Sequence, residues 1–188
     1  MRMIILGLGN PGSKYENTRH NVGFSVTDRL AAFFHVKLRK RCFRPYRQAR
    51  IEDSMIVQPL TYMNRSGSVL KYLPEEKELI VVCDQLDLPP GMIRIRQKGS
   101  SAGQRGLQSI IDETGSEAFI RIYVGIGRPG HGQSVVEHVL APGDDPLLET
   151  GIQKATEAVI KLLQGSDITE VMDEYNRKNT PRSDQTPH

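Results

Sequence analysis

MIILGLGNPG, residues 3–12, is the stretch that decides the fold class. Its first part, Met3–Leu8, is an uninterrupted apolar run that ends among glycines, which is typical of a buried strand. A second run of this kind, ELIVVCD at Glu78–Asp84, predicts another buried strand. Both runs belong to a pattern in which strand-like and helix-like segments alternate, and this pattern implies an α/β fold with a central sheet.

Helix-like segments separate the expected strands. In Asn21–His35 the apolar residues recur at helical spacing, and Asp145 followed by a proline predicts a helix that ends near Gln164. Arg47–Glu52 and Ser54–Pro59 resemble a hairpin, which favours a mixed sheet over a purely parallel one. We therefore expect one domain over residues 1–176, with a twisted mixed central β-sheet flanked by helices. The other expected elements are strands at Met92–Lys98 and Phe119–Gly127 and helices at Ser66–Leu73, Gly103–Thr114 and about residues 168–175.

Length and composition limit the class of protein. The chain has 188 residues, which suits one compact domain, and 38% of them are apolar, which excludes disorder over most of the length. The longest apolar run near the start is too short for a membrane span or a secretory signal, so we expect a soluble, cytoplasmic protein. Cys42 and Cys83 are too few for a disulfide scaffold and lack metal-site spacing. The polar tail at residues 177–188 is expected to be disordered.

Positive charge is concentrated between residues 37 and 50. This stretch holds seven basic residues and no acidic one, although the whole chain has a net charge of only +3. Phe43 and Tyr46 lie among the basic residues. The pattern is typical of surfaces that neutralise phosphates and stack on bases, and it equally fits a solvated, arginine-rich hairpin, so both interpretations stay open. The basic residues are Lys37, Arg39, Lys40, Arg41, Arg44, Arg47 and Arg50.

Gly7–Gly12 matches the G-x-G-x-x-G pattern of dinucleotide-binding proteins. In those proteins a helix begins inside the glycine loop. Here Pro11 disfavours helical backbone at Asn10, and residues 13–17 show no helical apolar spacing. Asp28 stands near the position of the expected acidic residue but falls inside a predicted helix. We therefore expect no nicotinamide site, and the turn instead presents Asn10 at the end of a strand.

Three more polar side chains are expected near Asn10. Asp84 closes the second buried strand, and Asn64 follows the strand that ends at Pro59. His20 precedes the first long helix and is suited to act as a base near neutral pH, and Asp84 could hold its imidazole in one tautomer. Taken singly, Asn10 could serve only its turn, and His20 could be a surface or capping histidine. Together at one sheet edge, however, the polar groups resemble a site. The five histidines show no metal-ligand spacing, so we expect no metal.

Four sequence blocks carry a family resemblance. They are LGLGNPGSKYENTRHNVGF at Leu6–Phe24, PLTYMNRSG at Pro59–Gly67, DQLDLPPG at Asp84–Gly91 and GIGRPG at Gly125–Gly130. In order and spacing these blocks resemble the bacterial-type peptidyl-tRNA hydrolases, from about residue 3 to residue 163. The combination is far more specific than any single motif.

The resemblance implies an enzyme that cleaves the ester between a peptide and the 3′ end of tRNA, recycling tRNA released early from ribosomes. It further implies a monomer that needs no metal or cofactor. His20 would take a proton from the attacking water, and Asp84 would orient His20. Asn10 and Asn64 would position the peptide and the water and donate hydrogen bonds near the developing oxyanion. Because an ester has a better leaving group than an amide, no covalent nucleophile is required.

The resemblance also implies substrate-binding residues, and four positions depart from the family pattern. Two of them, Cys83 and Gln85, replace the His and Glu that commonly flank the matched aspartate. Tyr15, Tyr62 and Met63 match positions that line the substrate channel. Gln104 and Arg105 stand where His and Asn are usual, in a glycine-rich loop that leads into a helix. The departure puts substrate positioning by that loop in doubt, although its backbone N–H groups could still bind an anion or a carbonyl group.

Contacts to tRNA are expected from arginines. Arg96 matches one of two basic positions that clamp the tRNA 5′ phosphate in relatives, and the other position falls on Tyr123. We expect Arg121 or the residue 37–50 stretch to compensate. An alternative interpretation is a non-catalytic, splicing-factor-like RNA-binding protein on the same fold, but such a protein needs no oriented base. A peptidase on a related fold lacks its expected metal ligands.

Overall fold

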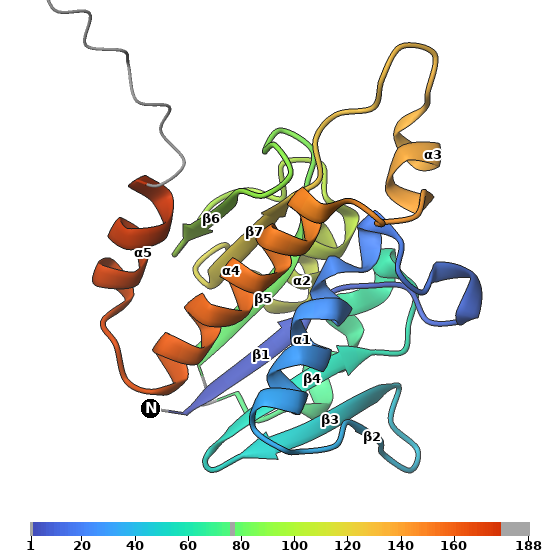
Figure 1. Ribbon diagram of the computed structural model, residues 1–188. Coiled ribbons are helices and arrows are strands. Elements are labelled where there is room, and N and C mark those ends of the chain that lie inside the picture. The colour runs from blue at the N-terminus through green and yellow to red at the C-terminus, as the bar shows by residue number, and fades with distance from the viewer. Residues whose placement is uncertain (1, 76–77, 178–188) are drawn as a thin grey trace, which may run out of the picture.

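The computed structural model describes residues 2–75 and 78–177 and contains a seven-stranded sheet with helices on both faces (Figure 1). The strands are β1 (Met3–Gly7), β2 (Arg39–Lys40), β3 (Tyr46–Ile51), β4 (Ser54–Pro59), β5 (Glu78–Gln85), β6 (Ile93–Arg96) and β7 (Ile120–Gly125). The α-helices are α1 (Val22–Phe33), α2 (Arg105–Thr114), α3 (Val135–Leu140), α4 (Pro146–Leu163) and α5 (Ile168–Arg177). Three 3-10 segments complete the fold, namely η1 (Ser13–Tyr15), η2 (Arg19–Asn21) and η3 (Met63–Tyr72).

The sheet is mixed, as expected. Its order is β2-β3-β4-β1-β5-β7-β6, with β4, β1, β5 and β7 parallel and in the centre. The strands outside this group, β3 and β2 at one side and β6 at the other, pair antiparallel. The two apolar runs of the sequence form the neighbouring strands β1 and β5 at the middle of the sheet. Since parallel strands end at the same edge, the residues that follow them are brought together there.

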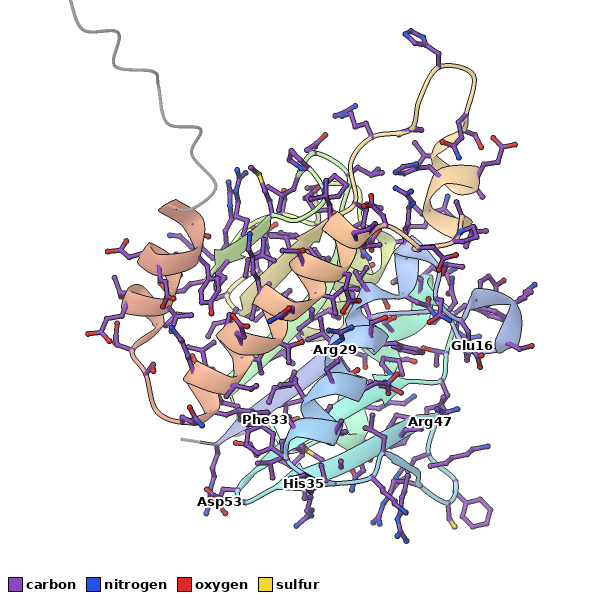
Figure 2. All side chains as sticks on the ribbon, in the orientation of Figure 1. Glu16, Arg29, Phe33, His35, Arg47 and Asp53 are labelled. Carbon is purple, nitrogen blue, oxygen red and sulfur yellow. The ribbon has the colours of Figure 1, made fainter. Side chains whose placement is uncertain are left out.

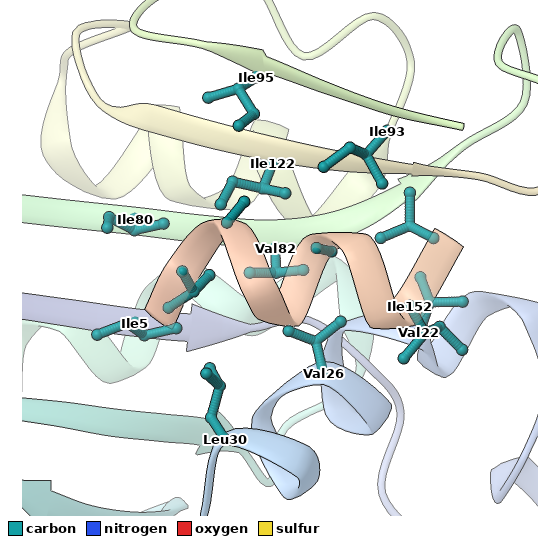
Figure 3. Packing of buried hydrophobic residues seen from close by; sticks show 14 of the residues in the cluster. Ile5, Val22, Val26, Leu30, Ile80, Val82, Ile93, Ile95, Ile122 and Ile152 are labelled. Atoms are coloured by element: carbon teal, nitrogen blue, oxygen red, sulfur yellow. The ribbon is translucent and has the colours of Figure 1, made fainter. Parts of the chain in front are cut away.

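Helices cover the two faces of the sheet in pairs. α1 and α4 lie on one face, and η3 and α2 lie on the other (Figure 1). α1 is amphipathic, because Arg29 points outward (Figure 2) while Val22, Val26 and Leu30 face the sheet (Figure 3). The two apolar clusters are separate, so the sheet itself divides the core.

Several local details differ from the expected pattern. The segment expected to be a short helix at Ser66–Leu73 forms the longer 3-10 segment η3, in which Ser66 and Ser68 donate side-chain hydrogen bonds to backbone carbonyls three residues earlier. α3 and the short strand β2 were not expected. The glycine loop is followed by the three-residue 3-10 segment η1. The tail expected to be disordered lies outside the described residues from residue 178 onward.

The close approach of η3 to α2 gives the first testable prediction. A Cβ atom on Gly67 would lie 2.0 Å from the carbonyl oxygen of Ser109 in α2. Gly67→Ala should therefore push the two segments apart and reduce the free energy of unfolding by about 1–3 kcal/mol, measured by urea denaturation. Gly130→Ala is the control, because a Cβ there meets no atom within 4 Å. Equal stability of the two variants would contradict the tight contact.

No helix within the described residues is both long and apolar enough to cross a membrane.

Candidate active site

A cleft of about 520 Å³ opens at the sheet edge where β1, β4 and β5 end. Asn10 follows β1, Asn64 follows β4, and Asp84 lies one residue before the end of β5. Eight of the ten candidate residues named from the sequence line this cleft. They are Asn10, His20, Tyr62, Met63, Asn64, Asp84, Gln104 and Arg105. Tyr15 and Arg96 are not part of its lining.

His20 and Asp84 form the central contact of the cleft. The Nδ1 atom of His20 lies 2.9 Å from Oδ2 of Asp84, and the two side chains are only 15% and 4% exposed. His20 is carried by η2, directly before α1. Gly23 lets α1 approach β1 closely, since a Cβ there would lie 2.4 Å from the backbone nitrogen of Leu8. The packing of α1 against β1 therefore fixes η2, and with it His20, over the end of β5.

The second carboxylate oxygen of Asp84 is held by Gln104. The Nε2 group of Gln104 donates to Oδ1 of Asp84 at 3.0 Å, while its Oε1 accepts from the backbone N–H of Leu107 at 2.8 Å and so caps α2. Asp84 is thus fixed through both oxygens, one on an imidazole and one on an amide. Gln104, which stands where the family usually has His, thus makes a hydrogen bond to the carboxylate of Asp84.

Asn10 is fixed by Asn21, a residue that the sequence analysis did not single out. Asn21 accepts from the backbone N–H of Asn10 at 2.8 Å and donates to its carbonyl oxygen at 2.9 Å. The Oδ1 atom of Asn10 in turn accepts from the backbone N–H of Met63 at 2.8 Å. Within the described part of the chain, the Nδ2 group of Asn10 has no acceptor, so this donor is left for a molecule in the cleft. No spacing in the sequence indicates this contact.

Aromatic and polar side chains form one wall of the cleft. Tyr62 and Asn64 are exposed, and the Tyr15 ring packs edge-on against Tyr62 with the ring centroids 6.3 Å apart. Tyr15 therefore supports the wall from outside the cleft. Arg105 is exposed at the N-terminus of α2, where its charge and the free backbone N–H groups of the helix both favour an anion.

Another part of the cleft wall is apolar and comes from α3, which is not among the elements expected from the sequence. Val135, Val136, Val139 and Leu140 of α3 line the cleft. His138 fixes this helix, because its Nε2 lies 3.1 Å and 2.9 Å from the carbonyl oxygens of Ile126 and Gly127. The capping box of Ser134 and Glu137, visible as S-V-V-E in the sequence, could have revealed the start of α3.

The expected substitutes for the second phosphate clamp are not placed to act as one. Arg121 is 0% exposed, donates to the carbonyl oxygens of Ser100 and Glu117, and lies over the Phe119 ring. Its guanidinium is therefore inside the protein and not free for a phosphate. The basic stretch at residues 37–50 lies at β2 and β3, on the opposite side of the sheet from Arg96 in β6. The expectation that Arg121 or residues 37–50 replace the second phosphate clamp is therefore wrong, because the former is buried and the latter lies too far from Arg96.

The arrangement can support base chemistry on a bound substrate. With Nδ1 of His20 facing Asp84, Nε2 has no hydrogen-bond partner among the described residues and can take a proton. Burial raises the pKa of the Cys83 thiol well above its usual range, so Cys83 stays protonated and is not a nucleophile. Residues 2–75 and 78–177 contain no group of three or more His, Cys, Asp or Glu side chains that could hold a metal ion.

Known proteins resemble this chain in both sequence and fold. The family model described as peptidyl-tRNA hydrolase matches residues 4–183. The peptidyl-tRNA hydrolases of Lactococcus lactis and Bacillus subtilis are each 42% identical over 94% of this chain, which corresponds to 100% and 99% of the relatives. The crystal structure of peptidyl-tRNA hydrolase from Acinetobacter baumannii has a TM-score of 0.81 and 34% identity, covering 93% of this chain and 94% of that one. The chain therefore belongs to the peptidyl-tRNA hydrolase family.

Proposed function

We propose that this chain hydrolyses the ester that joins a peptide to the 3′ end of tRNA, with His20 as the general base. The observation that carries the proposal is the 2.9 Å contact between His20 and Asp84 at the floor of a cleft large enough for an acyl–ribose linkage. We expect the enzyme to act as a monomer in the cytoplasm, where free tRNA is found.

The reaction follows from the orientation of His20. Its Nδ1–H donates to Asp84, so Nε2 is the basic atom and removes a proton from a water molecule as the water oxygen attacks the ester carbon. Asp84 stabilises the imidazolium that forms. When the bond to the ribose 3′ oxygen breaks, the imidazolium returns its proton to that oxygen. The products are tRNA with a 3′-hydroxyl group and the peptide carboxylic acid, which loses its proton to solvent and becomes the carboxylate.

Amide groups around the cleft are suited to bind the ester. The free Nδ2 group of Asn10 and the exposed amide of Asn64 can donate to the carbonyl oxygens of the substrate, including the one that becomes the oxyanion. Because Asn10 is fixed by Asn21 and Met63, its donor is oriented before the substrate arrives. The apolar wall of α3 and the ring of Tyr62 can accept the peptide side chains with little selectivity.

Binding of tRNA is assigned to exposed cations at α2 and β6. Arg105 lies at the cleft, and Arg94 and Arg96 alternate with buried isoleucines on β6, so both arginines are exposed. Contacts to phosphates and ribose would accept many tRNA sequences.

The salt dependence of tRNA binding tests this assignment. The slope of log affinity against log salt is negative, and Arg96→Ala should make it shallower by about 1, because one phosphate contact is lost. Binding of deacylated tRNA across a salt titration measures the slope. Arg2→Ala, at an exposed residue paired with Asp53, is the charge-matched control. If both variants keep the wild-type slope, Arg96 does not contact a phosphate.

Hydrolysis of N-blocked and free aminoacyl-tRNA tests the function itself. We expect release of the blocked amino acid and much slower release of the free one, since only the blocked form resembles a peptide. Binding of both tRNAs without hydrolysis of either would contradict the proposal and would favour the RNA-binding alternative.

Gln104 gives a sharper test of how Asp84 is held. Gln104→Glu keeps the oxygen that caps α2 but replaces the amide donor with a carboxylate that faces Asp84. We expect kcat for the blocked substrate to fall about 10- to 100-fold, as for other groups that orient a functional side chain. Gln104→His, which again offers an N–H donor, should retain most of the activity. Equal kcat for Gln104→Glu and wild type would show that the hydrogen bond to Asp84 is not needed.

A further inference from the structure

The basic stretch of the sequence forms a surface that the proposed reaction does not use. It lies on the β2–β3 hairpin, at the edge of the sheet opposite β6. Neighbouring strands are about 4.8 Å apart, so the hairpin and Arg96 are separated by roughly 30 Å across the sheet. The tip of the hairpin nevertheless lies at the same end of the strands as the cleft, because the backbone N–H of Leu60, just after β4, donates to the carbonyl oxygen of Pro45 at 2.7 Å.

The positive charge of this hairpin is almost uncompensated. All seven basic residues between positions 37 and 50 are exposed, and none lies within 4 Å of a carboxylate of the described chain. Arg47 points outward on the side of α1 (Figure 2), where it faces Asp28. On the other side of the hairpin, Arg39 is the strand partner of Gln48, and the backbone N–H of Arg41 donates to the carbonyl oxygen of Tyr46. The ring of Tyr46 packs in the apolar cluster below η3. Arg39 and Arg41 therefore lie toward η3, and Arg44 lies over the ring of Tyr72 at the end of η3.

Aromatic rings lie among these charges. Phe43 at the tip is 99% exposed and has a φ of 56°, a left-handed backbone conformation that a bulky residue rarely adopts. Neither its ring nor its backbone gains any packing in return. Beside the tip, the ring of Tyr72 is exposed at the end of η3, and its centroid lies 4.6 Å from Cζ of Arg44 and 5.2 Å from Nζ of Lys71. We call Arg39, Arg41, Phe43, Arg44, Lys71 and Tyr72 the hairpin patch.

We propose that the hairpin patch is a second RNA-binding surface, which binds an unpaired RNA segment apart from the catalytic cleft. Arg39, Arg41 and Arg44 would neutralise successive phosphates, and an unpaired base would stack on the free face of Phe43. An acidic peptide would use the cations but would leave the ring without a partner. Duplex RNA presents phosphates but no free base face, which makes unpaired RNA the ligand that uses both features.

Fluorescence anisotropy with a labelled oligouridylate tests the proposal on the full-length protein. Phe43→Ala should weaken binding by about 5- to 100-fold, the range for losing one stacked base. Arg41→Ala combined with Arg44→Ala should make the negative slope of log affinity against log salt shallower by about 1.4. Each phosphate contact to a single strand contributes about 0.7 to that slope. Arg2→Ala combined with Arg29→Ala removes the same charge outside the patch and should change neither value.

Competition and hydrolysis complete the test. Duplex RNA and polyglutamate should compete poorly with the labelled oligouridylate. RNA binding by the patch would be overturned if Phe43→Ala binds the probe as tightly as wild type. It would also be overturned if polyglutamate competes as well as unlabelled oligouridylate. All patch variants should hydrolyse an N-blocked aminoacyl minihelix at the wild-type rate. A parallel loss of hydrolysis would instead place the patch in the substrate site and overturn its separate role. RNA binding without any hydrolysis by wild type would contradict the proposed function but leave this inference standing.

Discussion

His20→Ala should lower kcat for an N-blocked aminoacyl-tRNA by about 10²- to 10⁴-fold, the range for removing a general base. The binding of tRNA should change little, because the cations assigned to phosphate contacts are elsewhere. Single-turnover hydrolysis at saturating enzyme measures the chemical step directly.

A second histidine provides the control for this variant. His131 is exposed in the loop before α3 and has no place in the mechanism, so His131→Ala should keep kcat within about 2-fold of wild type. Urea unfolding of both variants checks that the fold is intact. A loss of only a few-fold in a folded His20→Ala protein would rule out the role assigned to the imidazole.

Asp84→Asn should be nearly as damaging, with an expected loss in kcat of about 10²-fold or more. The amide is similar in size but carries no charge to stabilise the imidazolium. If its NH₂ group donates to Nδ1, the proton of the neutral ring moves to Nε2, and that atom can no longer act as a base. The variant should therefore lose kcat while keeping its KM.

Asp112→Asn on the exposed face of α2 is the matched control for the loss of one carboxylate, and it should hydrolyse the blocked substrate normally. If Asp84→Asn also hydrolyses it normally, the carboxylate does not set the tautomer of His20.

Much of this site could be predicted from the sequence, because the prediction depends on a general property of parallel strands. The runs at β1 and β5 are long and apolar enough to predict central strands, and central parallel strands end at a common edge. Polar residues directly after such runs, such as Asn10 and Asp84, are therefore close in space although they are far apart in the sequence. The contact between His20 and Asp84 agrees with that expectation.

Other parts depend on packing that residue patterns do not encode. α3 has only six residues, too few for helical spacing to be visible, and it is held by His138 through the carbonyl groups of Ile126 and Gly127, directly after β7. Asn21 acts through backbone atoms of Asn10, which no spacing rule predicts. The burial of Arg121 was also hidden, because an arginine in a strand is normally expected to be exposed.

The distribution of charge shows a related limit. The sequence shows that Arg96 and residues 37–50 are basic, but it does not show that they lie at opposite edges of the sheet. Only the strand order, with β2 at one side and β6 at the other, shows that they cannot hold the same phosphate. That separation is the reason for treating the hairpin patch as a surface with its own ligand.

Single-turnover hydrolysis of N-blocked aminoacyl-tRNA by wild type, His20→Ala, Asp84→Asn and the double variant tests the central claim most directly. If Asp84 acts through His20, the two side chains form one unit, and the double variant should be within about 3-fold of His20→Ala. If the two losses instead multiply, Asp84 acts on the substrate independently of the imidazole, and the mechanism proposed for this pair is wrong.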